Sequence, residues 1–520
     1  MVKYLIEVMF MSILEITNLK FSYGEKNLFN SLNMRLFQSD HLGLIGMNGV
    51  GKTTLMNLIA KKIDPDEGKV TWVDGVSFSY LDQHLKTFDD LTVYQYLYMV
   101  YDELFETERK INELYKSLET APESEYDKIL NKAYNLTNIL EDNGFYMIKS
   151  KIENVLNGLG ISVDNSFLIS KLSGGQRVKI FLAKMLLEEK DVLLLDEPTN
   201  FLDPLHVDWL SKYLVNYPKA FIVISHNTDF LNSITNIIGE LHNKQLTLYK
   251  GNYDAYLLQK SMNDERYIQE YEAQQKYIKK TEEFIKKNIA RASTSKQAKS
   301  RRKTLEKLEV LDKPISNKKV KFDFPFSHSF NKEAIIIKDL EIGYDRALLP
   351  KINLRIRFGE KLAIIGKNGV GKTTFIKTLL NIIPAISGLV RVSELNKIVY
   401  YSQEFKNELN LTAVEYIREV YPLMENTDVR DLLARFGING TLAVKTMNKL
   451  SGGELTKVRF ALLSLSDSNL LILDEPTNHL DVIAKEALRD ALEVYPGTVI
   501  LVSHEKEFYK DLNMKEIIFS

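Results

Sequence analysis

Short apolar runs alternate with amphipathic, helix-periodic stretches along most of this 520-residue chain. Two of the runs lead through a glycine-rich loop into segments with helical spacing, at residues 53–59 and 373–380. Uninterrupted apolar runs of this length are typical of buried strands. The alternation of such strands with helices predicts an α/β fold. The four clearest runs are residues 42–45, 192–195, 362–365 and 470–473.

The same series of short motifs occurs twice, which indicates an internal duplication. Each copy has a glycine loop, a Ser-Gly-Gly motif, an apolar strand that ends in two acids, and a Ser-His pair. We therefore predict two domains of one fold, at residues 11–255 and 331–520, joined by a linker at 256–330. The paired motifs are G-M-N-G-V-G-K-T-T at 46–54 and G-K-N-G-V-G-K-T-T at 366–374, L-S-G-G-Q at 172–176 and L-S-G-G-E at 450–454, D-E-P-T-N at 196–200 and 474–478, and S-H at 225–226 and 503–504.

The first copy carries about 42 more residues than the second between its glutamine, Gln83, and its Ser-Gly-Gly motif. Apolar residues recur there at three- and four-residue steps on both sides of a break at residues 121–124. This pattern predicts a helical hairpin inserted at about residues 100–145. A surface elaboration that packs only on its own domain would show the same pattern.

A second addition joins the two copies. It is long, polar and rich in helix formers, and two helices fit, at about residues 256–288 and 296–311. From Lys276 to Lys321 there are 16 Lys or Arg against five acidic residues, whereas the whole chain has a net charge of −1. A charged helix is often a solvated face. Residues 286–303, however, hold eight cations and no acid, which favours a segment that binds phosphates.

Composition excludes several classes of protein. The chain has no cysteine, so disulfides and thiolate metal sites are excluded and a reducing compartment is favoured. No apolar run approaches the length of about 18 residues that a membrane span needs. The apolar residues 1–10 include Glu7 and lack a small-residue cleavage site, which argues against a secretion signal. We expect a cytoplasmic protein without membrane insertion, whose natural start is either Met1 or Met11.

The two glycine loops lie where a strand leads into a helix, which is the context of a phosphate-binding P-loop. Glycines allow backbone amides to surround phosphates at a helix N-terminus. Lys52 and Lys372 would reach the β- and γ-phosphates of ATP, and Thr53 and Thr373 would hold Mg²⁺. The predicted nucleotide-binding residues are Gly46, Asn48, Gly49, Gly51, Lys52, Thr53 and Thr54 in the first loop, and Gly366, Asn368, Gly369, Gly371, Lys372, Thr373 and Thr374 in the second.

Two adjacent acids follow an apolar strand in each copy. Asp196 and Asp474 are placed to hold the Mg²⁺ shell, and Glu197 and Glu475 to polarise the attacking water. The alternative is that these carboxylates only cap the turn before the proline that follows them. A P-loop in the same copy favours the catalytic interpretation.

These motifs together resemble the ATP-binding-cassette superfamily over nearly all of both copies. The resemblance implies that the cassettes meet head to tail, so that each Ser-Gly-Gly motif completes the ATP site of the other cassette. It also implies that a glutamine senses Mg²⁺ and water, a histidine contacts the γ-phosphate and a tyrosine stacks on adenine, although such a tyrosine is often only a packing residue. The residues are Ser451, Gly452, Gly453, Gln83, His226 and Tyr23 around Lys52, and Ser173, Gly174, Gly175, Gln403, His504 and Tyr344 around Lys372.

The finer pattern resembles the ABC-F family, whose members join two cassettes through a basic helical linker, carry an arm in the first cassette and lack transmembrane domains. K-Q-A-K-S-R-R-K at residues 296–303 resembles that linker, and N-H-L-D at 478–481 matches the family's D-loop. The chain departs from the family at Phe201, which replaces His in the first D-loop, and after His504, where the second cassette is expected to be shorter than the first.

The resemblance implies a monomeric ATPase, with ATP and Mg²⁺ as cofactors, that pairs its own two cassettes and binds the ribosome near ribosomal RNA and peptidyl-tRNA. Its role would be that of a translation factor or of a ribosome-protection factor in antibiotic resistance, and the short hairpin tip at residues 288–295 favours the former. The predicted RNA-binding residues are Lys296, Lys299, Arg301 and Arg302.

Two functions from other classes remain as alternatives. The chain could be the ATP-hydrolysing motor of a membrane transporter whose transmembrane subunits are separate, although such a motor requires neither the arm nor the basic linker. It could also be a DNA-repair or chromosome ATPase, which the absence of cysteine and of longer coiled coils disfavours.

Overall fold

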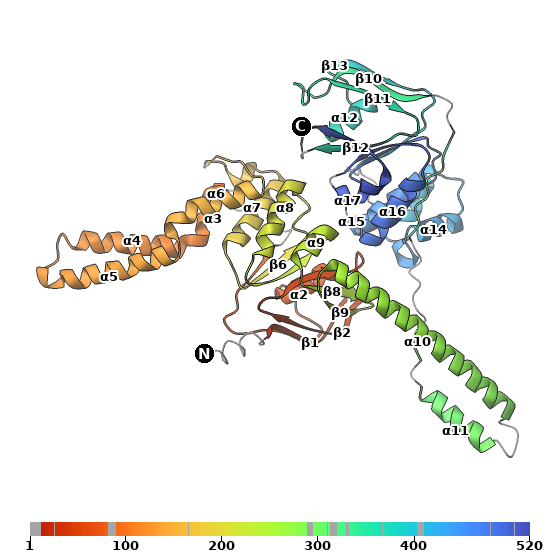
Figure 1. Cartoon of the computed structure of the whole chain (residues 1–520), viewed down its shortest axis with the longest axis horizontal. Helices are drawn as coiled ribbons and strands as arrows, with labels where there is room; N and C mark the ends of the chain where they lie inside the picture. Colours follow the sequence, from red (N-terminus) through yellow and green to blue (C-terminus); the bar gives the residue numbers. More distant parts are fainter. Residues whose placement is uncertain are drawn as a thin grey trace.

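The computed structural model describes residues 12–519 except 25, 82–89, 165, 289–294, 309, 312–319, 329–331, 367–368, 403–409, 479 and 504. Figure 1 shows two α/β domains and two helical projections that extend away from them. The predicted tandem of α/β domains is therefore confirmed.

The first domain contains a six-stranded sheet with the strand order β5-β6-β7-β3-β8-β9. Its neighbouring strands are parallel except for β8 and β9, which pair antiparallel. An antiparallel sheet, β2-β1-β4, shares a hydrophobic core with one face of this sheet. The strands are β1 (Ser12–Tyr23), β2 (Lys26–Phe37), β3 (His41–Ile45), β4 (Glu67–Trp72), β5 (Phe78–Leu81), β6 (Val192–Asp196), β7 (Ala220–Ile224), β8 (Ile237–His242) and β9 (Gln245–Lys250).

The second domain repeats this plan. Its parallel sheet has the order β14-β15-β16-β12-β17, and its antiparallel sheet has the order β11-β10-β13. The strands are β10 (Glu333–Glu341), β11 (Ile352–Arg357), β12 (Lys361–Gly366), β13 (Ser387–Val392), β14 (Ile398–Tyr401), β15 (Leu470–Asp474), β16 (Thr498–Val502) and β17 (Lys515–Phe519).

The central strand β6 shows why its apolar run is uninterrupted. Val192 and Leu194 point into the core between the two sheets, whereas Leu193 and Leu195 point into the core formed with the helices. Successive side chains of a strand face opposite sides of its sheet, so a strand covered on both sides needs apolar residues at every position. The equivalent strand β15 divides its residues between two cores in the same way.

Helices cover the sheets of both domains. In the first domain they are α2 (Lys52–Ile59), α3 (Val93–Tyr98), α6 (Ile148–Gly158), α7 (Gly174–Leu187), α8 (Pro204–Val215) and α9 (Thr228–Ile234). In the second they are α12 (Lys372–Leu379), α13 (Ala413–Val420), α14 (Asn426–Arg435), α15 (Gly452–Leu463), α16 (Val482–Val494) and α17 (Lys506–Tyr509). Short 3₁₀ turns are η1 (Met99–Tyr101), η2 (Phe145–Met147), η3 (Ile169–Lys171), η4 (Gly440–Leu442), η5 (Met447–Lys449) and η6 (Lys510–Leu512).

The insertion in the first domain is a hairpin of α4 (Asp102–Ser117) and α5 (Glu123–Asp142) that projects from the domain (Figure 1). Pro122 precedes α5 at its N-cap, where the missing N–H of proline costs no helical hydrogen bond. Ile111 and Ala133 are buried on their helices. The predicted helical arm is thus confirmed, with its break at the expected place.

The second projection is the linker, in which α10 (Tyr253–Asn288) packs on α11 (Ser295–Glu306). The prediction that the second linker helix reaches residue 311 was wrong, because α11 ends at Glu306. The N–H of Leu311 instead donates to the side-chain oxygen Oε1 of Gln274 in α10 at 2.8 Å, so the backbone at Leu311 is held against α10 without being helical. Within the described ranges, every helix is too short or too polar to cross a membrane.

Candidate functional site

Both P-loops form the strand-loop-helix turn that their glycines allow. The residue before each helix is a glycine in the left-handed region, with φ 108° at Gly51 and 111° at Gly371. A Cβ at Gly51 would also lie 3.0 Å from the ring of Phe29. The helices therefore begin directly at the two lysines, and their N-terminal amides and dipoles form an anion-binding end.

The P-loop lysines are held inside their own loops. Lys52 Nζ donates to Gly46 O at 2.7 Å, and Lys372 Nζ donates to Gly366 O at 2.7 Å. Burial lowers the pKa of both ammonium groups, and nearby carboxylates oppose that effect. Both side chains thus lie over the loops that the sequence predicts to surround phosphates.

The acids that follow the central strands are buried beside the P-loops. In the second domain Thr373 Oγ1 donates to Asp474 Oδ2 at 2.9 Å, and burial raises the pKa of Asp474 to about 6. The other carboxylate oxygen, Asp474 Oδ1, is buried and has no hydrogen-bond partner among the described residues. An unpartnered carboxylate oxygen next to a threonine hydroxyl fits the all-oxygen ligand set of Mg²⁺. Asp196 is similarly buried at the end of β6.

The two candidate bases share an unusual backbone conformation. Glu197 and Glu475 have φ of 50° and 49°, and their N–H groups donate to Ile224 O and Val502 O of the neighbouring strands. A non-glycine residue in this region is strained, and such strain is concentrated at functional sites. The same geometry in both domains indicates that the direction of these side chains is fixed by the fold.

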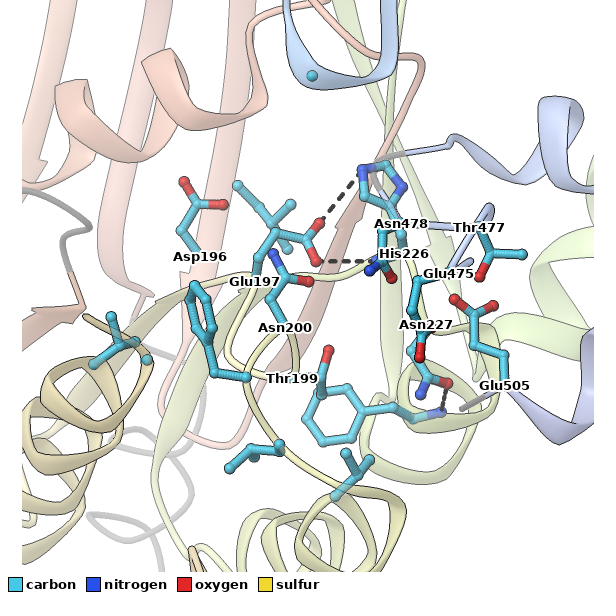
Figure 2. A pocket seen from close by; sticks show the side chains of 18 of the residues that line it. Asp196, Glu197, Thr199, Asn200, His226, Asn227, Glu475, Thr477, Asn478 and Glu505 are labelled. Atoms are coloured by element: carbon cyan, nitrogen blue, oxygen red, sulfur yellow. Dashed lines mark hydrogen bonds and ion pairs between the residues drawn. The ribbon is translucent and has the colours of Figure 1, made fainter. Parts of the chain in front are cut away.

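The Glu197 carboxylate faces His226 across the end of the sheet (Figure 2). Its Oε1 lies 3.4 Å from His226 Nε2, and its Oε2 accepts from the backbone N–H of His226 at 3.4 Å. Burial and the charge of Asp196 raise the pKa of Glu197 to about 8, and Lys52 opposes this shift. The side chain thus reaches the residue predicted to contact the γ-phosphate, which argues against a role limited to capping its own turn.

Each Ser-Gly-Gly motif begins a helix. Ser173 and Ser451 are the N-caps of α7 and α15, and both form capping boxes, with Gln176 and Glu454 respectively. The capping box fixes the helix end by satisfying the N–H of the third helical residue, so the N–H groups of the two glycines have no acceptor within the helix. Phe201, which replaces His in the first D-loop, lies beside one of these glycines: a Cβ at Gly175 would be 3.2 Å from its ring.

The motifs of both domains line one cavity of about 2140 Å³. Asp481, in the D-loop of the second domain, is close enough to Lys52 to oppose the burial that lowers its pKa. Asp203, in the D-loop of the first domain, acts on Lys372 in the same way. Each P-loop therefore faces the D-loop of the other domain, as a head-to-tail arrangement requires. The cavity is lined by Lys52, Thr53, Asp196, Glu197, His226, Ser451, Gly452 and Gly453, and by Lys372, Thr373, Asp474, Glu475, Ser173, Gly174 and Gly175, among others.

Comparisons with known proteins decide the family. The family described as ABC transporter matches residues 29–200 and 349–478, and a second family of that description matches residues 239–324. The chain is 33% identical over 506 residues to ABC transporter F family member 2 of Arabidopsis thaliana. This alignment covers 95% of this chain and 74% of that protein. This chain belongs to the ABC-F family. It is an ATPase with two ATP-binding cassettes.

Other matches concern the ATP-binding cassettes and the fold. The chain is 40% identical over 503 residues to the uncharacterized ABC transporter ATP-binding protein YfmM of Bacillus subtilis (strain 168), over 96% of this chain and 97% of that protein. Among solved structures, the archaeal ribosome recycling factor aABCE1, in complex with ribosomal stalk protein aP1, matches with a TM-score of 0.59 at 18% identity, covering 96% and 87% of the two chains. At this identity the likeness concerns the fold alone.

The remaining predicted residues of this ABC-F chain are placed less completely. Tyr23 is 73% exposed and lines the cavity, and Tyr344 is 68% exposed. Both side chains are therefore accessible to a base, and the ring of Tyr23 lies beside that of Phe21, with 6.4 Å between the ring centres. Four predicted residues lie outside the described residues: Gln83, Asn368, Gln403 and His504.

Sequence reasoning missed one contact of the site. Lys485 in α16 donates from Nζ to the carbonyl oxygen of His226, at 3.3 Å, and so joins the second cassette to the first. Neither the P-loop nor the Ser-Gly-Gly motif points to this position. A residue-by-residue comparison of the two cassettes could have drawn attention to Lys485, because the equivalent residue of the first cassette is the apolar Val207.

Proposed function

We propose that this ABC-F chain binds the ribosome in the cytoplasm when ATP draws its two cassettes together, places the linker against RNA, and leaves after hydrolysis. The observation that carries the proposal is the linker. Lys296, Lys299, Arg301 and Arg302 are all exposed on α11, and this helix projects away from both cassettes (Figure 1). A cationic helix held out from the body of the protein is the kind of surface that phosphates bind.

The contacts of α11 divide its cations into two groups. The Arg301 guanidinium lies 3.9 Å from the ring centre of Phe284 in α10, and Arg302 Nε is 3.0 Å from Glu306 Oε1. Arg301 therefore helps to hold α11 against α10, whereas Arg302 pairs with a glutamate of its own helix. Lys296 and Lys299 are exposed on the same helix and supply positive charge at the surface.

At the ATP sites we propose the roles that the geometry supports. The P-loop amides and lysines bind the phosphates, Glu197 and Glu475 orient and deprotonate water, and the Ser-Gly-Gly helix ends of the opposite cassette complete each site. Thr53 and Asp196, with Thr373 and Asp474, would hold Mg²⁺, together with Gln83 and Gln403. When bound, Mg²⁺ neutralises negative charge on the phosphate oxygens.

Two further points support the ribosomal proposal. Relatives that match over nearly the whole chain are members of the same family, and a protein of like fold is described as a ribosome recycling factor. The exposed cations of α11 are also the feature that a transporter motor does not need. The tip of the hairpin, on which the choice between translation factor and resistance factor depends, lies largely outside the described residues.

Replacing Lys296, Lys299, Arg301 and Arg302 by alanine is expected to weaken ribosome binding and reduce its salt dependence. Each phosphate contact releases counterions, so the slope of log affinity against log salt should fall by roughly two to four. The measurement is binding to 70S ribosomes at a series of salt concentrations, in the Glu197→Gln, Glu475→Gln background with ATP.

A variant with the same change in charge provides the control. Lys338, Arg355 and Arg391 are exposed on the antiparallel sheet of the second cassette, and Lys351 is exposed directly before β11. Replacing these four residues by alanine also removes two lysines and two arginines. This control should keep the original slope. Equal slopes for the linker variant and the unmodified background, with ATP affinity preserved, would overturn the ribosomal proposal and favour a transporter motor.

A further inference from the structure

One lysine contacts the switch loops of both cassettes. Lys485 lies in the first turn of α16, and its side chain is only 13% exposed. Its Nζ donates to both carboxylate oxygens of Glu505 at 2.8 Å, and to the carbonyl oxygen of His226 at 3.3 Å. Glu505 follows β16 in the second cassette, and His226 follows β7 in the first. A single ammonium group thus joins the two loops that follow equivalent strands.

The first cassette has other residues at both equivalent positions. Val207 lies four residues after Asp203, as Lys485 does after Asp481, and it packs against the apolar core of the first cassette. Asn227 is the equivalent of Glu505, and its Oδ1 accepts from the N–H of Phe230 at 3.0 Å, which caps α9. The bridge therefore has no counterpart between Val207 and the second cassette's loop, because valine carries no polar group.

Glu505 differs from Asn227 in how its side chain is used. Both residues occupy an N-cap, but the Glu505 side chain makes no capping hydrogen bond to α17. It turns instead to Lys485, and Figure 2 shows it in the pocket that contains Glu197 and His226. The second cassette thus lacks this side-chain helix cap, because Glu505 pairs with Lys485 instead. Such a cap typically contributes about 1 kcal/mol to stability.

The charge of Lys485 also reaches the first ATP site. Burial and Asp196 raise the pKa of Glu197, and Lys485 is one of the charges that oppose this, together with Lys52. A largely buried ammonium group loses hydration, and a buried ion pair is weak evidence for a contribution to stability. A role in fixing the position of neighbouring groups accounts better for its presence.

We propose that Lys485 is a positioning residue that holds the His226 loop of the first ATP site from the opposite cassette, anchored by Glu505, so that turnover at this site alone depends on the bridge. The proposal rests on the functions proposed above for Glu197, Glu475 and His226. The contact between the cassettes would make the two ATP sites unequal. The replacement of the D-loop histidine by Phe201 is a second difference between them.

The test measures each site separately. A Glu475→Gln background leaves the first site to turn over, and a Glu197→Gln background leaves the second. Lys485→Val installs the residue of the first cassette and should lower kcat at the first site by about tenfold, the scale of one strong hydrogen bond, with KM for ATP and second-site kcat within about twofold. Lys485→Arg should restore most of the loss, because it keeps the charge and donors.

The matched control is Lys361→Val. Lys361 is another partly buried lysine, and it donates to Leu492 O and Glu493 O at the opposite end of α16. If Lys485 merely stabilised α16, the two lysine-to-valine changes would affect both sites alike. An equal loss at both sites, or no loss at the first, would overturn the proposal.

A second readout covers the case in which either single glutamine variant stops all turnover. In the double-glutamine background, the much slower residual hydrolysis of bound ATP is followed in a single turnover. When Lys485→Val is introduced, this reaction should separate into two phases, because only the first site is slowed, by about tenfold. A single phase with both sites changed equally would contradict the proposal. Failure of the assigned catalytic roles would be recognised separately, because the double-glutamine parent would then hydrolyse ATP at the rate of the unmodified protein.

Discussion

Turnover of ATP is expected to fall by about 10²-fold or more when Glu197 and Glu475 are both replaced by glutamine, the scale for removing a general base. Both carboxylates are held at positive φ beside a strand-end aspartate, and glutamine keeps their shape while removing the basic oxygen. ATP binding should therefore remain. The measurement is steady-state phosphate release, with nucleotide affinity determined on the same preparations.

Two other glutamates provide the control for this double variant. Glu188 and Glu341 are partly buried, one in each cassette, and each accepts a hydrogen bond from a serine, Ser79 and Ser387 respectively. Glu188→Gln with Glu341→Gln makes the same chemical change away from the P-loops and should keep turnover within about twofold. Undiminished hydrolysis in the Glu197→Gln, Glu475→Gln protein would show that these residues are not the bases.

The second large effect is expected on stability. Lys457 in α15 and Asp481 at the start of α16 form a buried ion pair, with 2.7 Å between Nζ and Oδ2 and side-chain exposures of 7% and 6%. Asp481 Oδ1 also accepts from the N–H of Ala484, which caps α16. Lys457→Met should destabilise the second cassette by about 3–5 kcal/mol, because it leaves a buried carboxylate without its counter-ion.

Hydrogen exchange in α15 and α16 is the appropriate measurement for Lys457→Met. Both tryptophans of the chain, Trp72 and Trp209, lie in the first cassette, so their fluorescence should report an unchanged transition there. As a control, Lys20→Met breaks the exposed Lys20–Glu67 pair and should cost about 0–1 kcal/mol. Protection of α15 equal to that of the unmodified protein would contradict the expected role of the buried pair.

Local patterns were sufficient to predict most of the fold. The run at 192–195 predicted a buried strand because residues on both of its faces had to be apolar, and the glycines of each P-loop predicted a turn that only they adopt easily. The break in the arm was predictable for a similar reason, since Pro122 cannot continue the preceding helix.

Contacts between distant residues were not predictable in this way. Lys485 and His226 lie in different cassettes, and their contact depends on how two folded domains meet. The end of α11 was also not predicted. The N–H of Leu311 donates to Gln274 of a different helix, α10, and no local sequence signal marks that hydrogen bond. The packing of Arg301 over Phe284 likewise joins two linker helices.

Sedimentation with ribosomes tests whether ATP causes this protein to bind the ribosome. The Glu197→Gln, Glu475→Gln protein, mixed with 70S ribosomes and ATP at physiological salt, should sediment with them in far greater proportion than the same protein with ADP. This difference is expected because ATP joins the two cassettes, which places the linker against the ribosome, while the missing bases prevent the hydrolysis that allows release. If the protein stays in the supernatant equally with ATP and ADP, although it binds ATP, the proposed action on the ribosome is contradicted.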